Sequence, residues 1–205
     1  MNIITISRQF GSGGRRLGRA LAQRLGYDYY DKEIIAAIAE NKGMDENYVK
    51  NALDNERLQT LQQNYRGSLA RYTSTANTAL MLEEKKIIEE IAAQGRNCVI
   101  VGRNADILLA NHRPLNIFVC ADMAHRLRRC VDNAPEGENL TARELEKKIK
   151  QIDKARTKSR RVLTGSAWGR PEAYHLTVNT AGWQTEALAD TLALFAEKFF
   201  GRDDV

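Results

Sequence analysis

A glycine-rich turn near the N-terminus, F-G-S-G-G at positions 10–14, constrains the fold more than any other part of the sequence. A β-branched run at positions 3–6 precedes it, and apolar residues at helical spacing follow it as far as Gly26. This order predicts a strand, a glycine loop and a helix. The glycines permit positive φ and close backbone approach, so consecutive N–H groups can surround an anion at the helix N-terminus. A phosphate is the natural ligand, and a tight turn that binds nothing is the alternative.

The loop departs from two standard nucleotide-binding patterns. In G-x-x-x-x-G-K-[ST], Gly14 takes the lysine position and Arg16 lies near the hydroxyl position that contacts Mg²⁺. In G-x-G-x-x-G, Arg16 stands where the third glycine belongs, yet Asp31 follows Gly11 at the distance of a ribose-binding acid, so a dinucleotide-binding oxidoreductase stays open. Without a lysine, we expect Arg15 to supply the charge, because a guanidinium can bind phosphate oxygens from a slightly different backbone position.

Strand and helix patterns alternate along the rest of the chain. Asp31 is placed to cap a helix that follows it, and a polar, helix-rich segment over 44–95 suggests a helical insertion. Thr141 and Glu144 form a capping box for a long charged helix, and positions 185–200 predict a closing helix. Four further strands are predicted, at positions 27–30, 98–101, 115–120 and 174–180. The pattern predicts a mostly parallel sheet, covered by helices on both faces, that binds ligands beyond the carboxyl ends of its strands.

Size and charge narrow the class of protein. With 205 residues and 43% hydrophobic content, the chain fits one domain with a substantial core. Its net charge of +5 favours anionic partners. Cys98, Cys120 and Cys130 are odd in number and lack C-x-x-C spacing, so we expect no disulfide and no zinc site, and a reducing cytoplasm. No leader and no apolar run of about 18 residues is visible, so we expect a soluble protein without a membrane partner.

Three stretches resemble a known family. They are the N-terminal run from I-T-I-S-R-Q-F-G-S-G-G-R-R to Y-D-K-E-I-I, the segment G-R-N-A-D-I-L-L at 102–109, and W-G-x-P-x-x-Y-H-L-x-V-N-T at 168–180. All three are similar to segments of the cytidylate kinase-like family. The resemblance implies a three-layer α/β P-loop NTPase fold with a parallel, roughly five-stranded sheet, in a single domain over 1–205. It also implies a helical insertion of the nucleoside-monophosphate-binding type at about 44–95, a lid at about 130–165, and ATP bound with Mg²⁺.

Charged residues near the expected strand ends are the candidate site residues. The phosphate-binding loop is expected to comprise Arg8, Gly11, Ser12, Gly13, Gly14, Arg15 and Arg16. The expected catalytic residues are Arg15 and, by resemblance to the lid, Arg126, Arg156 and Arg160. By resemblance, Asp31 meets the acceptor nucleotide or helps to position the metal, and Arg103 contacts the acceptor phosphate. With Asp106, they are the expected acceptor-binding residues.

Several of these residues can also have a purely structural role. Asp31 can be a helix cap, Arg103 can belong to a surface salt bridge, and the lid arginines can be a solvated helix face. Asp106 is the best stand-in for an absent Walker-B aspartate, but no metal ligand is assigned. Family members usually carry tyrosines where Ser159 and Arg160 stand.

The expected function is an ATP-dependent nucleoside monophosphate kinase with a (d)CMP-like acceptor. A module that binds or senses nucleotide with little transfer is the main alternative, because the loop lacks its lysine. Nucleic-acid binding through the basic stretches 126–129 and 154–161 is not expected, since they lack interleaved aromatic residues. The insertion is expected either to select the acceptor base or to form a homodimer.

Overall fold

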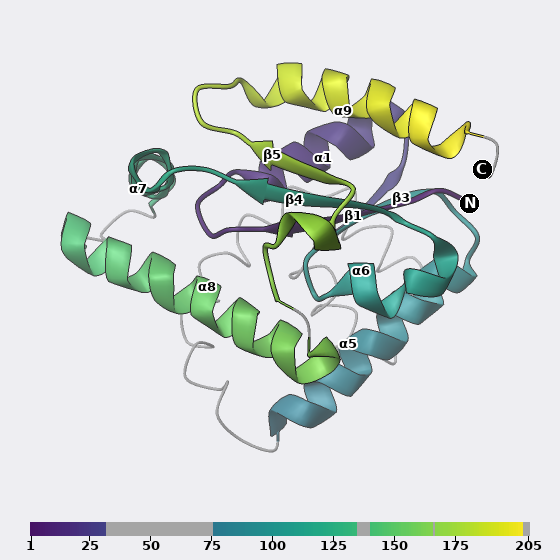
Figure 1. The fold of residues 1–205 in the computed structure, drawn as a ribbon, viewed down its shortest axis with the longest axis horizontal. Coiled ribbons are helices and arrows are strands. Elements are labelled where there is room, and N and C mark those ends of the chain that lie inside the picture. Colours follow the sequence, from purple (N-terminus) through teal and green to yellow (C-terminus); the bar gives the residue numbers. More distant parts are fainter. Residues whose placement is uncertain (32–75, 135–139, 166, 203–205) are drawn as a thin grey trace.

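The structure is a computed structural model that describes residues 1–31, 76–134, 140–165 and 167–202. Within these ranges, five parallel strands form one sheet in the order β2-β3-β1-β4-β5 (Figure 1). The strands are β1 (Ile3–Arg8), β2 (Asp28–Tyr30), β3 (Cys98–Val101), β4 (Leu115–Cys120) and β5 (Leu176–Asn179). Because all neighbours pair in parallel, the carboxyl ends of the strands lie along one edge.

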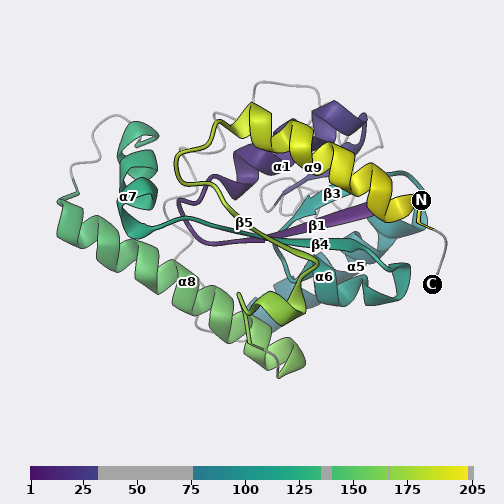
Figure 2. The same ribbon diagram turned by 45° about the horizontal axis from the view of Figure 1, so that its top comes forward.

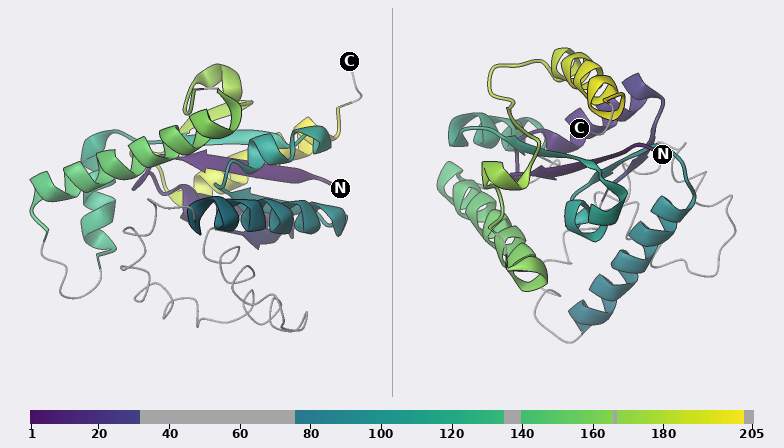
Figure 3. Two further views of the ribbon diagram at one scale, coloured as in Figure 1. Left: turned by 90° about the horizontal axis from the view of Figure 1, so that it is seen from below. Right: turned by 45° about the vertical axis from the view of Figure 1, so that its right-hand side comes forward.

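Helices cover both faces of this sheet. The helices are α1 (Gly14–Leu25), α5 (Ala76–Ala93), α6 (Ala105–Leu108), α7 (Met123–Asp132), α8 (Ala142–Thr164) and α9 (Thr185–Phe200), with short 3₁₀ turns η2 (Ala110–His112) and η3 (Pro171–Ala173). Figure 3 shows α1 and α9 on one face and α5 and α6 on the other. The predicted three-layer α/β fold of a single parallel sheet is therefore confirmed.

The strands are buried on both faces, as their continuous apolar sequences predict. Ile4 and Val99 pack in the core under α1 and α9, whereas Ile3 and Ile100 pack in the core under α5 and α6. Alternate residues of one strand thus enter opposite cores. This arrangement fixes β1 at the centre of the sheet and directs the glycine loop that follows it to the carboxyl edge.

Local signals end the helices where the sequence predicts. Gly13 and Gly26, with φ of 79° and 66°, flank α1 in the left-handed region. Thr141 and Glu144 form the predicted capping box at the start of α8. The helix expected after Asp31 and most of the 44–95 insertion, with its role in base selection or dimerisation, lie outside the described residues. No described helix is long and apolar enough to cross a membrane.

Candidate active site

The glycine loop between β1 and α1 lies against α7. A Cβ at Gly11 would come within 2.9 Å of the carbonyl oxygen of Arg126, and φ at Gly11 is 75°. Gly14 approaches β1 as closely, since its Cβ would lie 2.7 Å from that of Arg8. The first turn of α1 contains no acidic residue. The loop therefore presents the positive end of a helix dipole without a nearby side-chain anion from that helix.

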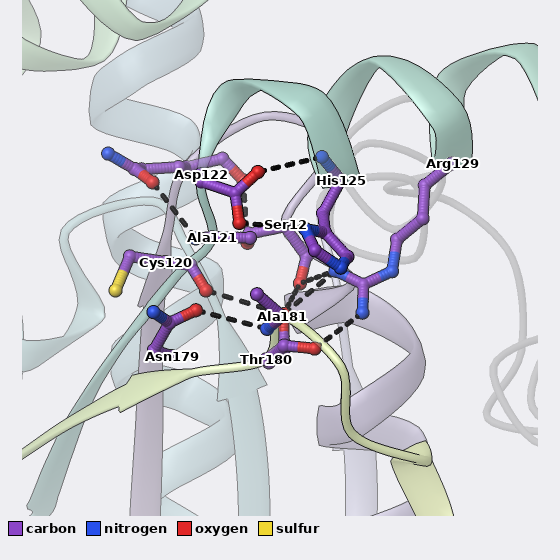
Figure 4. A network of polar contacts seen from close by, with 10 residues as sticks. Ser12, Cys120, Ala121, Asp122, His125, Arg129, Asn179, Thr180 and Ala181 are labelled. Atoms are coloured by element: carbon purple, nitrogen blue, oxygen red, sulfur yellow. Dashed lines mark hydrogen bonds and ion pairs between the residues drawn. The ribbon is translucent and has the colours of Figure 1, made fainter.

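Polar side chains of neighbouring segments hold the carbonyl oxygens of the glycine loop. Arg129 of α7 donates to the carbonyl oxygen of Ser12 (3.0 Å), to Oγ1 of Thr180 (2.8 Å) and to the carbonyl oxygen of Thr180 (2.7 Å), as Figure 4 shows. Thr180 donates to the same Ser12 oxygen at 2.6 Å. The Ser12 hydroxyl itself donates to the carbonyl oxygen of Gln9 (2.9 Å). These contacts join the loop to α7 and to the segment after β5.

Arg8 lies between the glycine loop and the loop after β3. A Cβ at Gly102 would lie 1.6 Å from Nη1 of Arg8, so only glycine leaves room for this guanidinium. Among the described residues, the guanidinium has no hydrogen-bond or ion-pair partner. Desolvation, together with the charges of Arg156 and Arg103, lowers the pKa of Arg8 from its ordinary value to about 9. A bound anion would stabilise a desolvated cation in this position beside the glycine loop.

Arg15 is paired with Asp31 in this structure. Its Nε and Nη2 both lie 2.9 Å from Oδ2 of Asp31, which is buried, whereas Arg15 is 37% exposed. Tyr29 donates from its hydroxyl to the same carboxylate at 3.2 Å. Burial and then the charge of Asp31 raise the pKa of Tyr29. Arg16, in contrast, is exposed and pairs with exposed Glu186 of α9, away from the loop.

The helix α8 lies next to α7 (Figure 2), and it contacts the loop through Asp153 and Arg156. Asp153 accepts the backbone N–H of Phe10 at 2.8 Å and forms ion pairs with Arg126 and Arg156. Arg126 also donates to the carbonyl oxygen of Phe10 (2.7 Å), and Arg156 donates to that of Arg8 (2.8 Å). Burial is the main cause that lowers the pKa of Arg156. One carboxylate thus holds two arginines and the loop backbone together.

The loop after β3 adopts an unusual backbone conformation. Gly102, Arg103 and Asn104 have φ of 85°, 57° and 53°, and such values are rare outside glycine. Asn104 donates to Ser159 of α8 at 3.2 Å. The charge of Arg103 lowers the pKa of both Arg8 and Arg156, which indicates that Arg103 faces the same cluster.

Two of the expected site residues lie away from this cluster. Asp106 and Arg160 are 3% and 1% exposed and form an ion pair with each other between α6 and α8. The guanidinium of Arg160 also lies over the ring of Tyr174, 5.5 Å from its centroid. This pair anchors the C-terminal part of α8 in the protein interior.

Three contributors to the site are not among the expected residues. Asp153 is on the same helix face as Arg156, and Arg129 is on the same face as Arg126, so helical spacing carried a signal for both. Thr180 stands directly after the last strand, where parallel sheets place their ligands. In the part of the chain that the structure describes, no group of three His, Cys, Asp or Glu side chains could hold a metal ion.

Solved structures with the same fold cover nearly the whole chain. A protein from Eubacterium ventriosum is 19% identical with a TM-score of 0.71, over 96% of this chain and 99% of the other. Shikimate kinase from Bacteroides thetaiotaomicron is 16% identical with a TM-score of 0.57, over 96% and 98%. Shikimate kinase from Acinetobacter baumannii, solved with shikimate, is 15% identical with a TM-score of 0.54, over 98% and 96%.

A search of curated proteins found no match to this chain. The family model, in contrast, covers most of its length and includes the glycine loop, the loop after β3 and the segment after β5. Because that model matches residues 3–182, the chain belongs to the cytidylate kinase-like family.

Proposed function

We propose that this protein is an ATP-dependent kinase that transfers the γ-phosphate to a nucleoside monophosphate, with a (d)CMP-like acceptor. Family membership and the P-loop kinase fold support a phosphotransferase that acts on a nucleotide or another small molecule. The acceptor rests on the family alone. The positive charges at the glycine loop support ATP as the phosphate donor.

The observation that carries the proposal is the environment of Arg8. Its guanidinium is desolvated and has no described hydrogen-bond or ion-pair partner. Desolvation and the charges of Arg156 and Arg103 outweigh the opposing effects of Tyr29 and Asp31, so its pKa falls to about 9. Such a site is unfavourable without a ligand and favourable once phosphate oxygens supply the missing negative charge. Arg8, rather than a residue of the helix, thereby becomes our first candidate for the work of the absent lysine.

Phosphoryl transfer depends on positioning and on cations around the transferred group. The loop N–H groups and Arg8 would hold the β- and γ-phosphates, while Arg126 and Arg156 would face the charge that develops on the transferred group. Arg15 is exposed enough to turn from Asp31 to the phosphates. Asp31 would then be available to the acceptor, as would Arg103.

The residues of the loop fit a nucleotide bound with Mg²⁺. Described carboxylates at the loop, Asp31 and Asp153, are engaged by arginines, so the phosphate oxygens would be the main ligands of the ion. Mg²⁺ would neutralise charge on the β- and γ-phosphates. Asp106 and Arg160 would support α8 from a distance without touching either substrate.

A module that binds nucleotide without efficient transfer is the second candidate. The pairing of Arg15 with Asp31 favours it, because this pair withdraws a cation and an acid from the loop. The two candidates agree on ATP binding and differ on turnover.

The test is an acceptor panel. ADP release would be measured with ATP, Mg²⁺ and one of CMP, dCMP, UMP, AMP, GMP or shikimate, and compared with ATP alone and with the variant Arg8→Met. We expect CMP or dCMP to give the highest kcat/KM, and Arg8→Met to abolish the difference from ATP alone. ATP binding by calorimetry without acceptor-dependent turnover would support the second candidate, and turnover with shikimate alone would contradict the nucleotide acceptor.

A further inference from the structure

A hollow of about 510 Å³ lies at the amino edge of the sheet, opposite the glycine loop. Asn116 is the second residue of β4 and His175 directly precedes β5, so both stand where the strands begin. In Figure 1 this edge carries α6, the end of α9 and the N-terminus. The described lining residues are Asp106, Ala110, Arg113, Pro114, Asn116, His175, Phe199 and Arg202. The hollow is therefore separate from the site of the proposed kinase reaction.

Asp106, one of the residues that line the hollow, has a buried carboxylate oxygen. Asp106 is 3% exposed, and its Oδ2 is taken by Arg160. Its Oδ1 is buried and accepts no hydrogen bond within the described structure. Buried polar atoms are nearly always hydrogen-bonded, so this oxygen calls for a donor. Buried Phe199 supplies an apolar surface to the same hollow.

The rim of the hollow is cationic. Arg113 has φ of 49° immediately before Pro114, a conformation that costs energy and is typical of functional positions. Arg202 lies over the ring of Phe199, with its guanidinium carbon 3.8 Å from the centroid. Both side chains can donate several hydrogen bonds to one anionic group.

His175 adds a neutral donor to the rim. Its Nδ1 accepts the backbone N–H of Asn116 at 2.9 Å, so Nε2 carries the proton. Burial, and then the charge of Arg202, lower the pKa of His175, which keeps the ring neutral at pH 7. The polar groups thus comprise two guanidiniums and an imidazole N–H at the rim, and the carboxylate oxygen of Asp106.

We propose that this hollow binds a small organic anion that also carries a hydroxyl or amino group, with a phosphomonoester of a polyol as the representative ligand. The anionic group contacts Arg113, Arg202 and His175, and the hydroxyl or amino group donates to Oδ1 of Asp106. The volume is that of an ordinary small-molecule site. This site is additional to the nucleotide sites of the proposed kinase.

The test is a residue-resolved titration of the 205-residue protein, monitored through its assigned ¹⁵N amide spectrum. The probes are glycerol 3-phosphate, ethyl phosphate, which lacks the extra hydroxyls, and glycerol, which lacks the anion. We expect glycerol 3-phosphate to shift the amides at positions 110–113, 115 and 116 and at His175. Ethyl phosphate should bind about tenfold more weakly, and glycerol should leave these amides unchanged. Shifts at Gly11 and Gly13 report separately on the glycine loop.

Matched variants assign the binding to the rim. Arg113→Gln and Arg202→Gln should each weaken the glycerol 3-phosphate response at the amino edge about tenfold, whereas Arg143→Gln, an exposed arginine of α8, should not. Shifts confined to the glycine loop, or no shifts, would overturn the site. Equal binding of ethyl phosphate would overturn the role of Asp106, and an unchanged response in both rim variants would overturn that of the arginines.

Discussion

Without a bound anion, the folded protein disfavours the charged form of the Arg8 guanidinium. Its pKa of about 9 lies well below the ordinary value of an arginine, so this group opposes folding fully below pH 9 and progressively less as the pH rises above 9. A bound phosphate must raise that pKa, and ATP binding near pH 9 should take up a proton. We expect Arg8→Met to weaken ATP binding roughly ten- to hundredfold at pH 7.5. Calorimetry measures both effects.

The pH profile separates Arg8 from its charged neighbours. The wild-type affinity for ATP should fall as the pH rises through 9, whereas that of Arg8→Met should stay level. Tyr29, which also faces Arg8, has its pKa raised above its ordinary value by burial and by the charge of Asp31, so it does not titrate in this range. An Arg8→Met protein with the wild-type pH profile would contradict the assignment.

Arg15 and its neighbour Arg16 form a natural pair of test and control. Arg15 contacts buried Asp31, whereas exposed Arg16 contacts exposed Glu186. We expect Asp31→Asn to release Arg15, tighten ATP binding a few-fold, and lower kcat at least about a hundredfold if Asp31 meets the acceptor. Arg16→Ala should change kcat/KM by less than about fivefold, as expected of a surface pair. Steady-state kinetics and ATP titration check both, and an unchanged kcat in Asp31→Asn would remove Asp31 from the site.

On α8, Asp153 forms ion pairs with arginines beside the glycine loop, whereas Glu146 forms an ion pair on the exposed surface. Removing the charge of Asp153 leaves Arg126 and Arg156 uncompensated beside the loop, so Asp153→Asn should lower the free energy of unfolding by about 3 kcal/mol. Saturating ATP should recover part of this loss, because phosphates supply negative charge to the same arginines. The control is Glu146→Gln, which breaks the exposed pair with Lys150 and should cost less than about 1 kcal/mol. Urea denaturation with and without ATP distinguishes these outcomes, and equal losses in the two variants would contradict the role of Asp153.

The sequence predicts these elements well and their mutual contacts poorly. Glycine capping, the T-x-x-E box and apolar strand runs are local signals, so α1, the start of α8 and the five strands could be predicted. The pairing of Asp106 with Arg160 joins positions 54 apart, and helical spacing only tells which face of α8 an arginine occupies. The order of the strands likewise depends on packing between distant segments. The arginines near the loop could therefore be identified, but not which of them is paired with an acid.

For the whole molecule, we expect ATP to raise the free energy of unfolding and the substitution of Arg8 to leave the free energy of the ATP-free protein nearly unchanged or slightly higher. At an ATP concentration of about 100 times Kd, binding adds about 2.7 kcal/mol to the free energy of unfolding. For a chain of this length we expect the melting temperature to rise by about 5–10 °C. Arg8→Met should lose most of this rise. Without ATP it should melt at the wild-type temperature or higher, since a desolvated cation without a described partner has been removed.

The two halves of this prediction distinguish a ligand-binding role from a structural one. A residue that held the fold together would lower the melting temperature without ATP and leave the ATP-dependent rise unchanged. Arg8 lies at the end of the central strand, where α8, the glycine loop and the loop after β3 converge, so a structural role should be visible in such a scan. Thermal unfolding of wild type, Arg8→Met and Arg16→Ala, each with and without ATP, measures both quantities. If Arg8→Met melts at or above the wild-type temperature without ATP, and ATP no longer raises its melting temperature, then Arg8 lowers the stability of the free protein and contributes to phosphate binding.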